Sequence, residues 1–149
     1  MLDICRISLF GHRNLEEYNA VEKGINAVLS ELLYTEQCVE IYIGRNGEFD
    51  IFAASVIKRF QKMTDDKKCE MTLVLPYSVK DIEDFQRYYD NVTIPVKAHP
   101  KAAITSRNRW MVENSDLVLV YVTKFCGGAY EAMRYAEKLK KRIINLARR

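Results

Sequence analysis

Short apolar runs alternate along this chain with longer segments in which apolar residues recur every three or four positions. The short runs are typical of buried strands, and the longer segments are typical of amphipathic helices. Pro95 predicts either an edge strand or an extended loop around it, because proline cannot donate a hydrogen bond to a neighbouring strand. The predicted strands are residues 4–10, 39–43, 71–75, 92–96, 116–122 and 142–146.

Helices are predicted between these strands. Asn14 and Glu17 have the spacing of a capping box, so the first helix is expected to begin at Asn14. Ser78 and Asp81 predict the cap of a short helix in the same way. Strands that alternate with helices predict parallel pairing through right-handed crossovers. We therefore expect one α/β domain over residues 1–149, a Rossmann-like three-layer sandwich whose mostly parallel sheet has about five to six strands.

Composition narrows the functional classes. The 149 residues carry a net charge of +3, an excess too small to indicate nucleic acid by itself. The N-terminus lacks the pattern of a secretory signal, and no apolar segment approaches the roughly 20 residues of a membrane-spanning helix. The four cysteines form no C-x-x-C pair. These features predict a cytoplasmic protein with reduced thiols and no contact with a membrane.

Four loops are expected to share one edge of the sheet, because the carboxyl ends of parallel strands meet there. Three of them carry glycine directly after a strand, where the backbone can approach a ligand closely. The helices that follow direct free N–H groups toward the same space, an arrangement that favours phosphate. The candidate ligand-binding residues on these loops are Gly11, His12, Arg13, Gly44, Arg45, Gly47, Gly127 and Gly128.

A second basic element lies on the predicted helix of residues 102–114. Helical spacing separates Arg107 and Arg109 by about 200°, so only one of them is expected to face the loops. An exposed polar helix face is the structural alternative. Neither the P-loop pattern nor G-x-G-x-x-G occurs in the chain, so the motifs give no support to an ATPase or a dehydrogenase.

Three carboxylates near these loops are candidates for catalysis: Glu48, Asp50 and Glu131. Asp50 has a structural alternative as a helix cap, and Glu131 has one as a complement to a helix dipole. In a functional role, one of them would bind ribose hydroxyls or assist the cleavage of a glycosidic bond. His12 is either a hydrogen-bonding loop residue or a general acid or base. With His99 the only other histidine, no metal site and no cofactor are expected.

Several segments, taken in order, resemble the YpsA-like branch of the SLOG superfamily. Residues 10–13 (F-G-H-R) resemble its T/S-G-H-R start, and residues 44–50 (G-R-N-G-E-F-D) resemble its glycine-rich segment ending in Asp. Residues 107–112 (R-N-R-W-M-V) before Ser115-Asp116 resemble its R-N-x-x-M/I-V/I segment. Gly127-Gly128 matches the double glycine after its fifth main strand. The resemblance runs from about residue 4 to 146.

The superfamily includes the Smf/DprA type and the LOG-type phosphoribohydrolases, and its members have Rossmann-like folds. The resemblance implies binding of nucleotides, nucleotide-derived signals or, in DprA-like members, single-stranded DNA. Residues 126–132 (C-G-G-A-Y-E-A) depart from the LOG motif P-G-G-x-G-T-x-x-E, so the resemblance does not carry the LOG reaction. The implied ligand contacts are Gly11, Arg13, Gly44, Asp50, Arg107, Asn108, Gly127 and Gly128.

The leading hypothesis from the sequence is a protein that binds a nucleotide or nucleotide-derived ligand, in the manner of a sensor. The first alternative is a nucleotide N-glycosidase of the phosphoribohydrolase kind, which requires one of the three carboxylates at the glycosidic bond. The second alternative is DprA-like binding of single-stranded nucleic acid, which requires a basic groove. A homodimer is expected, since relatives in the superfamily often dimerise.

Overall fold

The computed structural model describes residues 3–35, 38–64 and 68–147. Within these ranges the chain forms six strands and five helices. The strands are β1 (Ile4–Gly11), β2 (Cys38–Ile43), β3 (Cys69–Val74), β4 (Asn91–Thr93), β5 (Leu117–Tyr121) and β6 (Arg142–Asn145). The helices are α1 (Tyr18–Tyr34), α2 (Glu48–Thr64), α3 (Ile82–Tyr88), α4 (Ala103–Glu113) and α5 (Gly128–Lys138).

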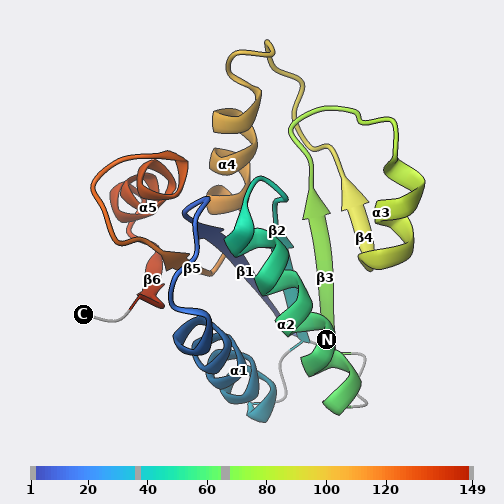
Figure 1. Ribbon diagram of the computed structural model, residues 1–149, viewed down its shortest axis with the longest axis vertical. Coiled ribbons are helices and arrows are strands. Elements are labelled where there is room, and N and C mark those ends of the chain that lie inside the picture. Colours follow the sequence, from blue (N-terminus) through green and yellow to red (C-terminus); the bar gives the residue numbers. More distant parts are fainter. Residues whose placement is uncertain (1–2, 36–37, 65–67, 148–149) are drawn as a thin grey trace.

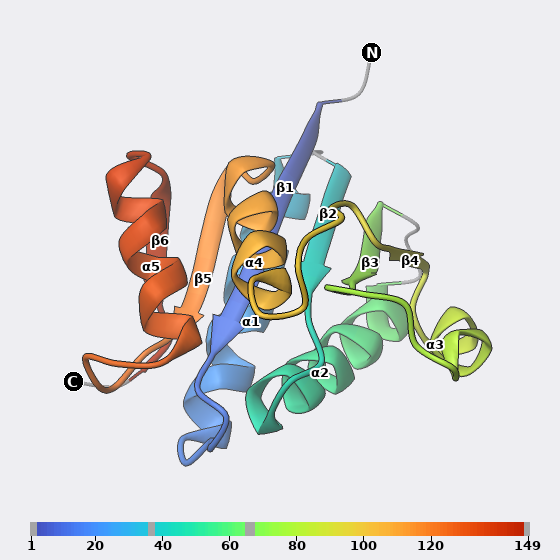
Figure 2. The ribbon, with the colours of Figure 1, turned by 90° about the horizontal axis from the view of Figure 1, so that it is seen from above.

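All the strands pair in parallel, in the order β4-β3-β2-β1-β5-β6. Helices α1 and α2 cover one face of the sheet, and α4 and α5 cover the other (Figure 1). Helix α3 lies beside the edge strand β4, as the view from above shows (Figure 2). The expected Rossmann-like three-layer α/β fold is confirmed, and every strand pairing is parallel.

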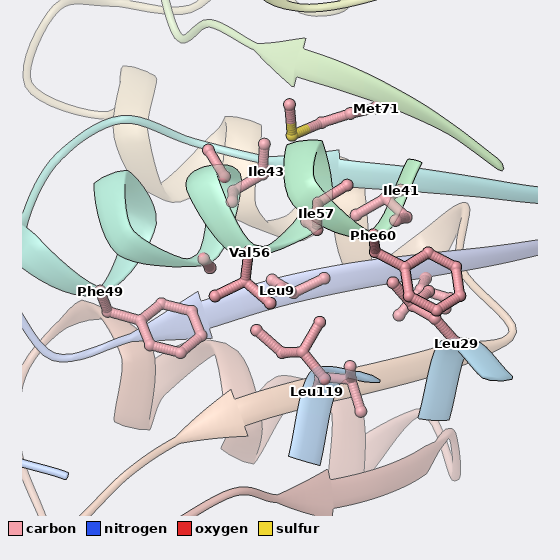
Figure 3. Packing of buried hydrophobic residues seen from close by; sticks show 14 of the residues in the cluster. Leu9, Leu29, Ile41, Ile43, Phe49, Val56, Ile57, Phe60, Met71 and Leu119 are labelled. Atoms are coloured by element: carbon pink, nitrogen blue, oxygen red, sulfur yellow. The ribbon is translucent and has the colours of Figure 1, made fainter. Parts of the chain in front are cut away.

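Side chains alternate between the two faces of β1. Ile7 and Leu9 are buried under α1 and α2, while Phe10 packs on the opposite face with residues of α4 and α5. The larger cluster, between the sheet and α1 and α2, includes Phe49 and Phe60 of α2 (Figure 3). All five residues of β5 are buried, as its continuous apolar sequence predicts.

The first helix begins later than its capping box predicts. Helix α1 starts at Tyr18, and Glu17 stands at the N-cap position without a side-chain cap. Leu15 is buried instead, and its N–H donates to Glu48 Oε2 at 2.9 Å. This long-range hydrogen bond and the burial of Leu15 keep residues 12–16 out of the helix, so the prediction of a start at Asn14 is wrong.

The edge of the sheet at β4 is shorter than predicted. Strand β4 ends at Thr93, and Pro95 follows outside it. Of the two alternatives that Pro95 predicts, β4 is the edge strand. Helix α3 begins at Ile82 with Asp81 at its N-cap and no side-chain cap hydrogen bond. Ser78 therefore does not cap this helix, although the helix exists where the pattern places it.

Candidate functional site

The strand order reverses between β1 and β5. From β1 the chain continues to β2 and outward to β4, and it then returns through α4 to pair β5 with the other side of β1. In open parallel sheets, ligands bind beyond the carboxyl ends of the strands at such a switch point. A cavity of about 340 Å³ lies at this place, lined by the loops after β1, β2 and β5 and by α4.

The predicted ligand residues meet at this cavity, with one exception. Those that line it are Gly11, His12, Arg13, Gly44, Gly47, Arg107, Asn108, Gly127 and Gly128. Asn46 and Lys124 also line it and were not singled out from the sequence, although both lie on the expected loops. The other lining residues are apolar, and no sequence signal marks them as cavity residues: Leu9, Phe10, Ile104, Met111 and Ala129.

Two arginines point elsewhere. The guanidinium of Arg45 lies 4.9 Å from the centre of the Phe85 ring, and Arg45 is not among the residues that line the cavity. Arg109 stacks in the same way over Tyr135, also at 4.9 Å. The expectation that only one of Arg107 and Arg109 faces the loops is therefore met, because Arg107 lines the cavity.

Arg107 is the most unusual charged residue of the site, because its side chain is buried. The residue is only 3% exposed, and its Nη1 donates to the carbonyl oxygen of Val74 at 2.8 Å. Its Nε donates to Asn108 Oδ1, also at 2.8 Å. Burial lowers the pKa of Arg107, while the nearby Asp50 charge raises it. Within the described residues, no carboxylate forms an ion pair with this guanidinium.

Three glycines are explained by local geometry. A Cβ on Gly44 would lie 2.8 Å from Arg107 Nη1, so a side chain there would displace the guanidinium. A Cβ on Gly47 would lie 2.7 Å from the Cα of Arg13, where the loops after β1 and β2 touch. Gly127 has a φ of 95°, a conformation that favours glycine, and it stands at the N-cap of α5. The free N–H groups of the first turn of α5 thus lie at the cavity.

Glu48 and His12 connect the loops around the cavity by hydrogen bonds, and only His12 of the two also lines it. The Glu48 carboxylate accepts the N–H of Leu15, and the Glu48 N–H donates to the carbonyl oxygen of Arg13 at 2.9 Å. His12 Nε2 accepts the N–H of Thr123 at 2.9 Å, which joins the loops after β1 and β5. Burial and then the Lys124 charge lower the pKa of His12, so the ring is held in its neutral, accepting form.

Of the three candidate carboxylates, Asp50 alone lines the cavity. Its Oδ2 accepts the N–H of Asn46 at 2.9 Å, so it ties the loop before α2 to the first turn of the helix and does not cap a free N–H of the helix itself. Burial raises the pKa of Asp50 to about 6, against the opposing effects of the Asn46 hydrogen bond and the Arg107 charge. Glu131 is exposed in the first turn of α5 and does not line the cavity.

Other features of the described residues bear on the expectations from composition. None of the described helices has both the length and the apolar character needed to cross a membrane. The same residues contain no group of His, Cys, Asp and Glu side chains arranged to hold a metal ion. All four cysteines are free thiols.

Comparison with known proteins found similar proteins only among solved structures. No family model matches the chain, and no curated protein matches it. DNA processing protein A (DprA) from Streptococcus pneumoniae superposes with a TM-score of 0.69 and 18% identity, over 94% of this chain and 49% of that protein. DprA from Helicobacter pylori superposes with a TM-score of 0.65 and 18% identity, over 97% of this chain and 66% of that protein.

The two likenesses establish a shared fold. This chain spans about half the length of the Streptococcus pneumoniae protein and about two thirds of the Helicobacter pylori protein. The Helicobacter pylori protein binds single-stranded DNA.

Proposed function

We propose that the cavity binds a phosphate-bearing nucleotide or a nucleotide-derived ligand, and that the chain belongs to the YpsA-like branch of the SLOG superfamily. The observation that carries the proposal is the buried guanidinium of Arg107, which lines the cavity without a carboxylate ion pair among the described residues. A buried charge is costly unless it is paired. Asp50 is close enough for its charge to raise the Arg107 pKa but forms no ion pair with it, so a bound anion would supply the direct pairing.

The surroundings of Arg107 suit a phosphate group in particular. A guanidinium has five N–H donors. In Arg107, one donor on Nη1 and the donor on Nε form hydrogen bonds within the protein. The remaining donors are available for the parallel contacts that arginine makes with phosphate oxygens. The N-terminus of α5 at Gly127 and Gly128 adds free N–H groups and the positive end of a helix dipole.

Thermal shift with a panel of AMP, NAD, ADP-ribose and cyclic dinucleotides tests the proposal. A ligand present at 100 times its Kd stabilises the fold by about 2.7 kcal/mol. For a chain of this size, that corresponds to a rise in Tm of roughly 5–11 °C. Arg107→Ala is expected to abolish the shift. Arg107→Lys is expected to weaken binding, because an ammonium cannot make the paired contacts of a guanidinium.

Arg109→Ala is the matched control, since it removes the same charge from the same helix. Arg109 stacks on Tyr135 outside the cavity, so this variant is expected to bind with unchanged affinity. Circular dichroism of each variant confirms that it is folded before binding is compared. The absence of a shift with every compound, or equal loss of binding in both variants, would contradict the proposed site.

Single-stranded DNA is the second candidate ligand, supported by the DprA structures that share the fold. A phosphodiester presents the same anionic oxygens to Arg107, and Arg13 and Lys124 lie at the same cavity. Each phosphate contacted on a single strand contributes a slope of about −0.7 to the dependence of log K on log salt. Binding of an oligodeoxynucleotide with a steep slope, and of no mononucleotide, would favour this candidate over the first.

A further inference from the structure

We propose that Asp50 selects the ligand by accepting a hydrogen bond from a sugar hydroxyl, so that the site prefers ribonucleotides over their deoxy forms. The inference rests on the proposed function, because it names the class of nucleotide that the same cavity takes. It separates the two candidate ligands, since deoxyribose in DNA lacks the 2′-hydroxyl and the 3′-oxygen there is esterified.

The geometry leaves one acceptor of Asp50 unused. The side chain projects from the first turn of α2 and lines the cavity. Its Oδ2 is fixed by the N–H of Asn46 at 2.9 Å, which sets the orientation of the carboxylate. No hydrogen bond joins Oδ1 to any part of the chain that the structure describes, nor does Asp50 form an ion pair there. The cavity therefore contains an oriented oxygen that can accept a ligand hydrogen bond.

The chemistry around this oxygen restricts what can meet it. Arg107 lies on the same cavity and takes the phosphate, whereas Asp50 as an anion repels any phosphate oxygen placed against it. A metal ion would need further oxygen, nitrogen or sulfur ligands, and the described residues hold no group of acidic, His or Cys side chains of that kind. The part of the ligand that faces Asp50 must then be a neutral hydrogen-bond donor.

Sugar hydroxyls are the donors that every ribonucleotide carries close to its phosphate. A cavity of about 340 Å³ is at the small end of the range for ligand sites. Its volume therefore suits a phosphate and a sugar better than a whole dinucleotide. An exocyclic amine of the base is the other neutral donor of a nucleotide. The two donors are distinguished by comparing AMP with its deoxy forms on one hand and with IMP on the other.

Isothermal titration with AMP, 2′-deoxy-AMP, 3′-deoxy-AMP and IMP tests the assignment. The unmodified protein is expected to bind AMP roughly tenfold or more tightly than at least one deoxy analogue, the difference expected for a hydrogen bond to a charged group. Asp50→Ala is expected to keep binding AMP and to reduce the preference to within about twofold. Asp50→Asn has nearly the same shape and serves as the second variant if Asp50→Ala does not fold. Glu131→Gln is the control, because this exposed carboxylate lies outside the cavity and its loss should leave the preference unchanged.

The outcomes distinguish a failure of this inference from a failure of the proposed nucleotide binding. If AMP, its analogues and IMP all fail to bind, this inference is contradicted, whereas the proposed function is contradicted only if NAD, ADP-ribose and the cyclic dinucleotides also fail to bind. If AMP and both deoxy analogues bind equally, Asp50 does not select the sugar, while the phosphate site stands. If AMP binds more tightly than IMP but equally to its deoxy forms, the base amine is the group that is recognised, and the inference is overturned. A preference that persists in full in Asp50→Ala, which has no side-chain acceptor, overturns it as well. In Asp50→Asn the preference should fall without vanishing, because an uncharged amide can still form a weaker hydrogen bond with a hydroxyl; an unchanged preference in this variant also overturns the inference.

Discussion

Asp50 is expected to lower the stability of the ligand-free protein at neutral pH. Burial raises its pKa from 3.8 to about 6 in the folded state, so the folded protein holds this proton more tightly than the unfolded chain does. Between about pH 4 and pH 6, the folded state binds more protons than the unfolded state. The contribution of Asp50 to the free energy of unfolding therefore falls as the pH rises through this window.

The size of the effect follows from the shift in pKa. One pKa unit is worth about 1.36 kcal/mol, so a shift of roughly two units costs the folded state about 3 kcal/mol above pH 6. Asp50→Asn mimics the protonated form and keeps an oxygen that can accept the N–H of Asn46. The variant should therefore be more stable than the unmodified protein by up to about 3 kcal/mol at pH 7, or roughly 6–12 °C in Tm.

Thermal unfolding of both proteins from pH 3.5 to pH 8 measures this difference. Taking the difference between the two proteins removes the contributions of other titrating groups, including His12. Glu83→Gln removes a charge from an exposed position in α3 and should change stability by less than about 0.5 kcal/mol at every pH. The reasoning is refuted if Asp50→Asn is no more stable at pH 7, or if its advantage is the same at pH 3.5.

Two further variants test the geometry of the cavity. Gly44→Ala brings a Cβ to 2.8 Å from Arg107 Nη1 with no change in charge. The variant should abolish nucleotide binding in the titration assay and cost about 1–3 kcal/mol of stability. Retained affinity would show that binding does not depend on the position of the guanidinium. His12→Ala leaves the N–H of Thr123 without its acceptor and should cost about 1–3 kcal/mol at pH 8, measured by urea unfolding. Because the pKa of His12 is lowered, its contribution to the free energy of unfolding is present above about pH 6.5 and is lost as the pH falls. The stability cost of His12→Ala should therefore shrink at pH 5. A cost that stays constant with pH would show that the ring is not held neutral.

The strands and the position of the cavity were predictable because both depend on signals that are local in the sequence. Apolar runs predict buried strands, and the rule for parallel sheets then brings the glycine-containing loops to one edge. The start of α1 was not predictable, because it depends on the bond between Leu15 and Glu48, two residues far apart in the sequence. Local capping preference at Asn14 is outweighed by this contact and by the burial of Leu15.

The direction of Arg45 was unpredictable for a related reason. Glycine-rich loops place arginines near a site, but the ring of Phe85 on α3 offers this guanidinium a competing partner. The position of α3 beside the sheet cannot be derived from the sequence around residue 45. In contrast, the opposite orientations of Arg107 and Arg109 follow from helical spacing alone, and the structure agrees with them.

The residues that line the cavity lie in four segments of the sequence, within residues 9–13, 44–50, 104–111 and 124–129, so they come from positions spread over most of the chain. The three strands that position these walls are neighbours only through long crossovers, because β1 pairs with β2 and with β5. No fragment that lacks one of them contains the cavity. A bound ligand therefore stabilises the fold as one cooperative unit, and amide hydrogen exchange should slow together in β1, β2 and β5 when it binds.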